Sequence, residues 1–203
     1  MFSFKDVLNA AILLGLAGAL ACMAPAQRAS SSSPMPSSGS NPAKMTQSDK
    51  TFVKKAAEGG IAEVELGKLA TEKAASQEVK QFGQRMVDDH SKANDQLKQV
   101  AQNQGFTLPT QPSAAQKAEK VKLSKLSGQQ FDKAYMSTML KDHKEDVAEF
   151  RHESRSAKDA ALKDFAQQTL PTLQSHLKEA ETIAPKEGVQ TSSARQQQAP
   201  MTK

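Results

Sequence analysis

The chain has 203 residues, a formal net charge of +5 and few aromatic residues, with eight Phe, one Tyr and no Trp. This length allows one domain with appended segments, and a composition dominated by Ala, Gln, Lys, Leu and Ser favours helices over sheet. The lysines are mixed with Asp and Glu, without a basic stripe or aromatic residues placed for base stacking, so we expect no nucleic-acid partner.

Residues 1–26 have the pattern of a secretion signal. Lys5 precedes an apolar stretch at 7–20, which is shorter than the about 20 residues of a membrane-spanning helix. Two small-residue cleavage sites follow, one that ends at Ala21 and one that ends at Ala26. Cleavage at the first site would leave Cys22 for lipidation, as in a bacterial lipoprotein, and cleavage at the second would release a soluble chain. Both cleavage sites predict export to the periplasm or outer membrane. With a lipid anchor on Cys22, the partner would be the cell envelope or a membrane.

Two segments poor in apolar residues flank the candidate domain. Residues 27–47 are rich in Ser and Pro, and residues 186–203 contain a glutamine run without periodicity, so both are predicted to be disordered. The domain between them, 48–185, is long enough for one four-helix bundle. Because Cys22 is the chain's only cysteine, this domain has no internal disulfide and depends on packing for its stability.

Apolar residues recur at steps of three and four in five stretches of this domain. The pattern predicts an all-α fold, an antiparallel four-helix bundle with a short extra helix between the second and third long helices. The five helices, with their capping residues, are expected at 48–75, 76–104, 113–126, 127–155 and 156–184. Gly59 and Gly60 are expected to weaken the middle of the first helix.

Serines are placed to cap four of these helices. Ser76, Ser113, Ser127 and Ser156 each precede a periodic stretch, and Ser113 and Ser127 are followed three residues later by Gln, which gives the capping-box pattern. Pro171 lies inside the last helix, where it lacks an N–H and should produce a kink.

Five motifs occur in order along the domain. They are AEGG at 57–60, EVELG at 63–67, FGQRMVDDH at 82–90, FDKAY at 131–135 with DH at 142–143, and LPTL at 170–173 with His176. With these motifs the chain resembles the bacterial domain of unknown function 4142 (DUF4142) over residues 48–184. That family is described as predicted outer-membrane or periplasmic proteins with a ferritin-like bundle. The resemblance implies a ferritin-like fold in the cell envelope and brings no established activity.

Three of the four histidines, His90, His143 and His176, lie on the apolar stripes of three different predicted helices. If the helices pack side by side, the imidazoles meet inside the bundle, where polar groups need partners. One interpretation is a polar layer that sets the register of the helices. The other is a metal site for Fe, Zn or Cu, to which the first helix would add Glu65 or Glu63. A single ion requires the ring nitrogens to lie within about 6 Å of one another.

The carboxylates near these histidines differ from the pattern of ferritin-like di-iron sites. Such sites use Glu-x-x-His pairs, and here the residue three positions before each histidine is apolar. Asp146 and Glu179 follow two of the histidines by three residues, so a metal site would turn them toward the ion. Asp89 and Asp142 are expected to face solvent at the rim of their helices, and His152 is expected on the surface.

The domain lacks the sequence signatures of common catalytic sites, with no Gly-rich phosphate loop, no Gly-x-Ser-x-Gly elbow and no cysteine nucleophile. We therefore expect no catalytic residues and no enzyme activity. The function predicted from sequence is that of an exported helical-bundle protein of the cell envelope, structural or stress-related. The alternative is a metal-binding ferritin-like protein with a His and carboxylate site in its core.

Overall fold

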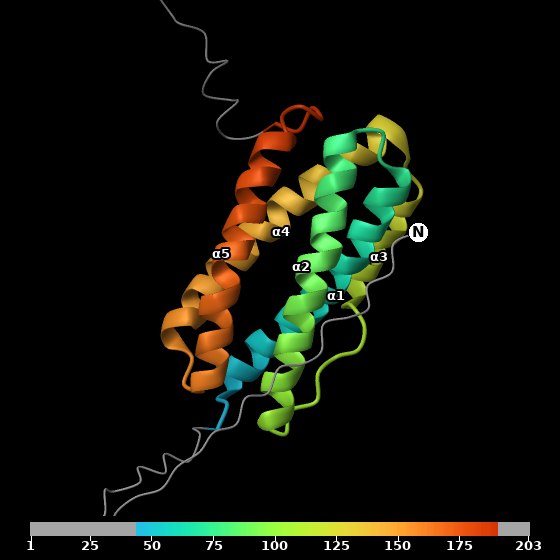
Figure 1. The fold of residues 1–203 in the computed structure, drawn as a ribbon. Coiled ribbons are helices and arrows are strands. Elements are labelled where there is room, and N and C mark those ends of the chain that lie inside the picture. The colour runs from blue at the N-terminus through green and yellow to red at the C-terminus, as the bar shows by residue number, and fades with distance from the viewer. Residues whose placement is uncertain (1–43, 191–203) are drawn as a thin grey trace, which may run out of the picture. The chain divides into compact units, whose positions relative to one another are not determined.

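The computed structural model describes residues 44–190, and it shows them as helices and connections without any strand (Figure 1). The helices are α1 (Gln47–Lys73), α2 (Gln77–Asn103), α3 (Ala114–Ser124), α4 (Gly128–Ser156) and α5 (Ala160–Ile183). The predicted all-α bundle with a short extra helix is confirmed. The predicted signal peptide, Cys22, and the tail beyond residue 190 lie outside the described residues. In the described part no helix is both long and apolar enough to cross a membrane.

Two helix hairpins make up the bundle. Residues 74–76 join α1 to α2, and residues 157–159 join α4 to α5. The hairpins pack with α1 against α4 and α2 against α5. Between the hairpins, residues 104–127 carry the chain back along α1, with α3 packed on that helix (Figure 1). Neighbouring long helices therefore run antiparallel, and a single long crossover connects the two hairpins.

The apolar core consists of two clusters toward opposite ends of the bundle. One contains Phe82, Phe131 and Tyr135, and the other contains Phe52 and Phe150. Each cluster combines the first halves of two helices with the second halves of the other two, as an antiparallel arrangement requires. The polar groups of the middle lie between the two clusters and form the site described below.

The ends of the domain extend beyond the limits predicted from sequence. Helix α1 begins just before residue 48 because Thr46 caps it: Thr46 Oγ1 accepts a hydrogen bond from the Asp49 N–H at 3.2 Å, and the Asp49 carboxylate accepts one from the Thr46 N–H at 2.8 Å. Met45 is buried, so residues 44–47 belong to the fold and not to the linker. After α5, Val189 packs against the core and Lys186 pairs with Glu78 at 2.8 Å.

The predicted serines occupy the cap positions of three helices, and one of them makes the expected side-chain hydrogen bond. Ser113 forms the expected capping box at the start of α3. Ser76 and Ser127 occupy the cap positions of α2 and α4 but make no side-chain hydrogen bond there. Ser156 is the last residue of α4, and Asp159 caps α5 instead: its Oδ1 accepts a hydrogen bond from the Leu162 N–H at 2.8 Å. A carboxylate placed directly before the helix outcompetes a serine three residues earlier.

Small residues let α1 and α2 approach closely. A Cβ atom on Gly67 would lie 2.5 Å from the Gly83 carbonyl oxygen, and one on Gly83 would lie 2.6 Å from the Ala70 Cβ. Gly60 gives room to the Asn94 side chain, and α1 continues unbroken through it. The expected weakening of this helix is therefore offset by its contact with α2. Helix α5 likewise continues on both sides of its internal proline.

Candidate metal centre

Four polar side chains from four helices meet in the middle of the bundle. Glu63 comes from α1, His90 from α2, His143 from α4 and His176 from α5, and their exposed fractions are 4%, 6%, 0% and 1%. The centroids of the imidazole rings lie 5.3, 5.4 and 5.7 Å apart. One ring nitrogen of each histidine lies within 4.8 Å of the others. The three predicted histidines thus come together at the separation that a single ion requires.

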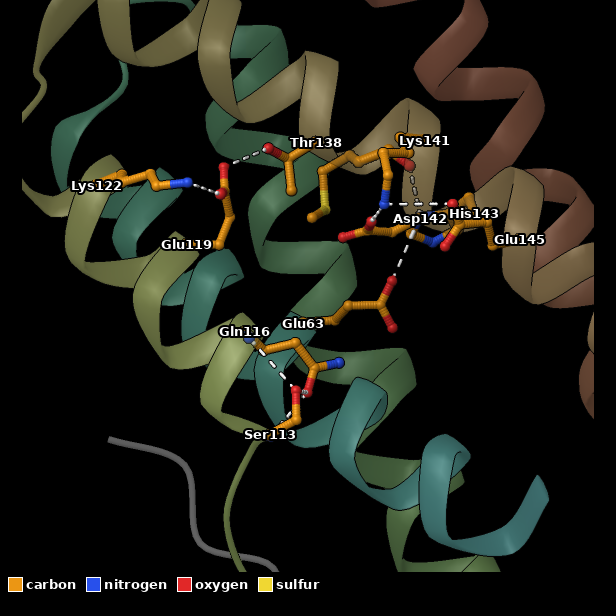
Figure 2. A network of polar contacts seen from close by, with 11 residues as sticks. Glu63, Ser113, Gln116, Glu119, Lys122, Thr138, Lys141, Asp142, His143 and Glu145 are labelled. Atoms are coloured by element: carbon orange, nitrogen blue, oxygen red, sulfur yellow. Dashed lines mark hydrogen bonds and ion pairs between the residues drawn. The ribbon is translucent and has the colours of Figure 1, made fainter. Parts of the chain in front are cut away.

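Glu63, and not Glu65, is the carboxylate that α1 contributes to the cluster. Glu63 Oε2 lies 2.9 Å from His90 Nδ1. Its Oε1 lies 3.4 Å from His143 Nδ1, a contact that Figure 2 shows. Glu65 follows two residues later and so lies on a different face of the helix. It pairs with Lys120 at 2.9 Å on the side that α3 covers, which removes it from the predicted ligand set.

Two of the histidines each donate one ring N–H to a fixed acceptor. His143 Nδ1 lies 3.0 Å from the Met139 carbonyl oxygen, and His176 Nε2 lies 2.8 Å from Asp89 Oδ2. A carbonyl and an ionised carboxylate can only accept, so these ring nitrogens carry the protons. In a neutral imidazole the second nitrogen then has a free lone pair. These second nitrogens, His143 Nε2 and His176 Nδ1, lie 3.3 Å apart.

The neutral rings therefore point lone pairs at each other. Two lone pairs at 3.3 Å form no hydrogen bond unless a proton or a cation lies between them. His90 adds a third ring nitrogen to the group, because its Nδ1 is held by Glu63 and its buried Nε2 has no hydrogen-bond partner among the described residues. Buried polar atoms without a partner are costly, and a cation bound to these three nitrogens would compensate that cost.

The surroundings keep two of the rings neutral. Burial lowers the pKa of His143, and burial also lowers the pKa of His176 to about 4. Burial acts on His90 too, but the neighbouring Glu63 carboxylate outweighs it and raises the pKa of His90. For Glu63 burial opposes ionisation, yet the histidines around it hold its pKa below the usual range. The cluster thus combines an ionised carboxylate with two neutral imidazoles, and a metal ion bound at His90 would displace the proton that Glu63 favours on that ring.

This donor set fits a transition-metal ion. Protein histidines that bind a metal through one nitrogen donate the other N–H to a carboxylate or a carbonyl, and all three rings here have such a partner. A nitrogen separation of 3.3 Å suits two ligands that each lie about 2 Å from a common ion. The paired glutamates and Glu-x-x-His motifs of a di-iron site are not present in the cluster.

A comparison with models of protein families assigns the chain to a family. A family model described as "Domain of unknown function (DUF4142)" matches residues 34–183. The chain belongs to this family. A search of curated proteins finds no match to it.

Solved structures share the fold of this DUF4142 domain. One is a DUF305 fragment from Deinococcus radiodurans, which is 16% identical with a TM-score of 0.62, over 71% of this chain and 99% of that chain. Another, described as a "putative secreted protein DUF305" from Streptomyces coelicolor, is 14% identical with a TM-score of 0.61, over 70% of this chain and 94% of that chain. At these identities the likeness shows the fold alone.

The carboxylates around the DUF4142 cluster differ from the sequence expectations. Asp89 was expected to face solvent, and although 41% of its side chain is exposed it binds His176. Glu179 was expected to turn toward a metal, and it pairs instead with Arg85 at 2.6 Å. Both side chains are partly exposed, so this pair lies at the surface between α2 and α5 and not in the core.

Two other polar residues of α4 lie near the cluster without joining it. Asp146 is half-buried and lines a small cavity beside His90 and Glu63; burial raises its pKa well above the ordinary value. Asp142 pairs with Lys141 at 3.3 Å, as Figure 2 shows, which agrees with its expected place at the rim. His152 is exposed, as predicted.

Proposed function

We propose that the protein binds one transition-metal ion through His90, His143 and His176, in the core of a bundle that works outside the cytoplasm. The observation that carries the proposal is the 3.3 Å approach of His143 Nε2 and His176 Nδ1, whose opposite nitrogens both donate to acceptors. A cation between these atoms and His90 Nε2 would bind all three ring nitrogens and compensate the cost of their burial.

The competing function is purely structural, a polar layer that fixes the register of similar helices. In such a layer each polar atom is expected to find a protein partner, and the three converging nitrogens argue against it. A bound ion would nevertheless have a structural effect, because it would tie α2, α4 and α5 together. We propose binding and not catalysis as the activity of this centre.

The ligand chemistry favours some ions over others. Three imidazole nitrogens suit Zn²⁺ and Cu²⁺, which bind such donors more tightly than Fe²⁺ does. The carboxylates of Glu63 and Asp89 both hold ring N–H groups and so act on the ion through the histidines. We therefore expect zinc or copper to bind ahead of iron.

The proposed location is the periplasm or the outer membrane. It rests on the signal pattern of residues 1–26, and the name of the Streptomyces neighbour, a secreted protein, supports it. Lipid on Cys22 would attach the protein to a membrane. Mass spectrometry of the mature N-terminus tests this: a diacylglyceryl group on Cys22 or a start at Gln27 is expected, and an intact Met1 would contradict export.

The binding proposal is tested with protein purified without a histidine tag and stripped of metal. Titration with Zn²⁺ and Cu²⁺ should give one ion per chain by calorimetry and elemental analysis. His143→Ala should weaken binding at least about tenfold. The matched control is His152→Ala, which removes an exposed histidine of the same helix and should leave binding unchanged. Equal binding by both variants would reject the site.

A further inference from the structure

A small cavity lies against one side of the histidine cluster. Its volume is about 30 Å³, and Glu63 and His90 form part of its wall. Apolar side chains of the cluster around Phe150, among them Leu97 and Phe165, close much of the remainder. A volume of this size exceeds the about 10–15 Å³ that one water molecule needs, and it leaves room for a ligand of only a few heavy atoms.

The wall of this cavity carries polar groups whose hydrogen bonding is incomplete. His90 Nε2 and Glu63 Oε1 are buried side-chain atoms without a hydrogen-bond partner among the described residues, and both residues line the same space. Asn94, Asp146 and Thr169 add amide, carboxyl and hydroxyl groups. A cavity lined in this way is suited to a small polar molecule, because an empty polar cavity leaves its wall atoms desolvated without compensation.

The three imidazoles leave a coordination position unused. The proposed ion would have three protein ligands. The carboxylates of Glu63 and Asp89 are both engaged by ring N–H groups and so are not free to serve as a fourth. Zinc sites with three protein ligands take a water or another small molecule in the fourth position, whereas sites that only stabilise a fold are closed by four protein ligands. The cavity is lined by His90 and by residues one helical turn from the other two proposed ligands, Asp146 after His143 and Leu173 before His176.

We infer that this cavity is the open coordination position of the centre, and that it takes a small oxygen or nitrogen ligand of one to three heavy atoms. Water occupies the position when no other ligand is offered, and it can hydrogen-bond to Glu63 and Thr169. The inference rests on the proposed metal site and adds an exchangeable ligand of limited size. Ligands the size of phosphate do not fit a space of about 30 Å³.

The test uses the Co²⁺-loaded full-length protein, because the visible absorption bands of Co²⁺ respond to each change of ligand. Addition of azide should shift these bands in a saturable way, and addition of phosphate should not. A spectrum that azide leaves unchanged would overturn the inference while leaving the metal site intact. An equal response to phosphate would also overturn the inference, because it would show that the size of the cavity does not limit the ligand. A protein that binds no cobalt would overturn the metal site and this inference together.

A filled cavity provides the second arm of the test. Ala93→Leu places a larger apolar side chain in the wall of the cavity, and it should weaken azide binding at least tenfold while cobalt still binds one per chain. The matched control is Ala161→Leu on the exposed face of α5, with unchanged azide binding. Thr169→Val, which keeps the side-chain volume, should weaken azide binding even if the larger substitution disturbs folding. Azide binding that survives both cavity variants would overturn the assignment of the ligand to this cavity.

Discussion

Asp89 Oδ2 binds His176 Nε2 at 2.8 Å across the interface between α2 and α5. This contact fixes the orientation of a buried ring from a carboxylate that is itself partly exposed. It also determines which ring nitrogen carries the proton, and so directs the lone pair of Nδ1 toward His143. The orientation of the proposed ligand set therefore depends on a residue that does not belong to it.

Removal of this carboxylate is predicted to weaken metal binding without abolishing it. In Asp89→Ala the His176 ring loses its fixed tautomer, and the zinc affinity should fall about 10- to 100-fold. The measurement is zinc titration by calorimetry. Asp88→Ala serves as the control, because that neighbouring residue is exposed and bonds only Gln84 among the described residues. Equal affinity of the two variants would show that Asp89 has no positioning role.

An apolar residue in place of one ligand should separate metal binding from folding. His143→Leu removes a buried imidazole and fills nearly the same volume, and in the metal-free protein it also removes one of the two ring nitrogens that face each other without a proton between them. We predict that the metal-free variant unfolds in urea at a concentration close to that of the metal-free wild type. Addition of zinc should then stabilise only the wild type. Equal stabilisation of both proteins by zinc would place the ion elsewhere.

A buried carboxylate ties the two hairpins together at the turn before α2. Asp132 of α4 is fully buried and accepts hydrogen bonds from the N–H groups of Ala75 and Ser76 at 3.1 and 2.8 Å. Asp132→Ala leaves these donors without their acceptor, so the free energy of unfolding should fall by about 1–3 kcal/mol. Asp164→Ala, an exposed aspartate of α5, should change it by less than about 0.5 kcal/mol. Similar urea midpoints for both variants would contradict this account.

A second buried acid, Glu153, should make the free energy of unfolding depend on pH. Glu153 is buried, and burial together with the adjacent Asp49 raises its pKa from 4.5 to about 7. Because the folded protein holds this proton more tightly than the unfolded chain does, the contribution of Glu153 to stability is present below pH 4.5 and falls as the pH rises toward 7. Glu153→Gln should therefore gain stability relative to wild type between pH 5 and pH 8, measured by urea unfolding. A constant difference across this range would contradict the raised pKa.

The spacing of apolar residues was sufficient to predict the fold and the three histidines. His90, His143 and His176 each keep the three- and four-residue steps of their helices, so their burial follows from periodicity. Glu65 was predicted as the carboxylate of the site, with Glu63 as the alternative, although Glu63 shares a face with Leu66 and Gly67, which lie three and four residues later and are buried. That spacing would have selected the correct carboxylate.

The role of Asp89 was not accessible from sequence in the same way. A residue beside a buried histidine lies at the edge of the apolar stripe, and whether it faces solvent or a neighbour depends on how the adjacent helix is rotated. Here α5 turns His176 toward it. The pairing of Glu179 with Arg85 is also a relation between two helices, so a rule that considers one helix alone could not predict it.

X-ray absorption at the zinc edge tests the central claim most directly. The zinc-loaded protein should show three imidazole nitrogens at about 2.0–2.1 Å and one further light atom. Replacement of His90, His143 and His176 by Ala should remove the imidazole signal together with the bound zinc. A zinc environment made of oxygen ligands alone, or an unchanged spectrum in the triple variant, would contradict the assignment of a metal centre to this cluster.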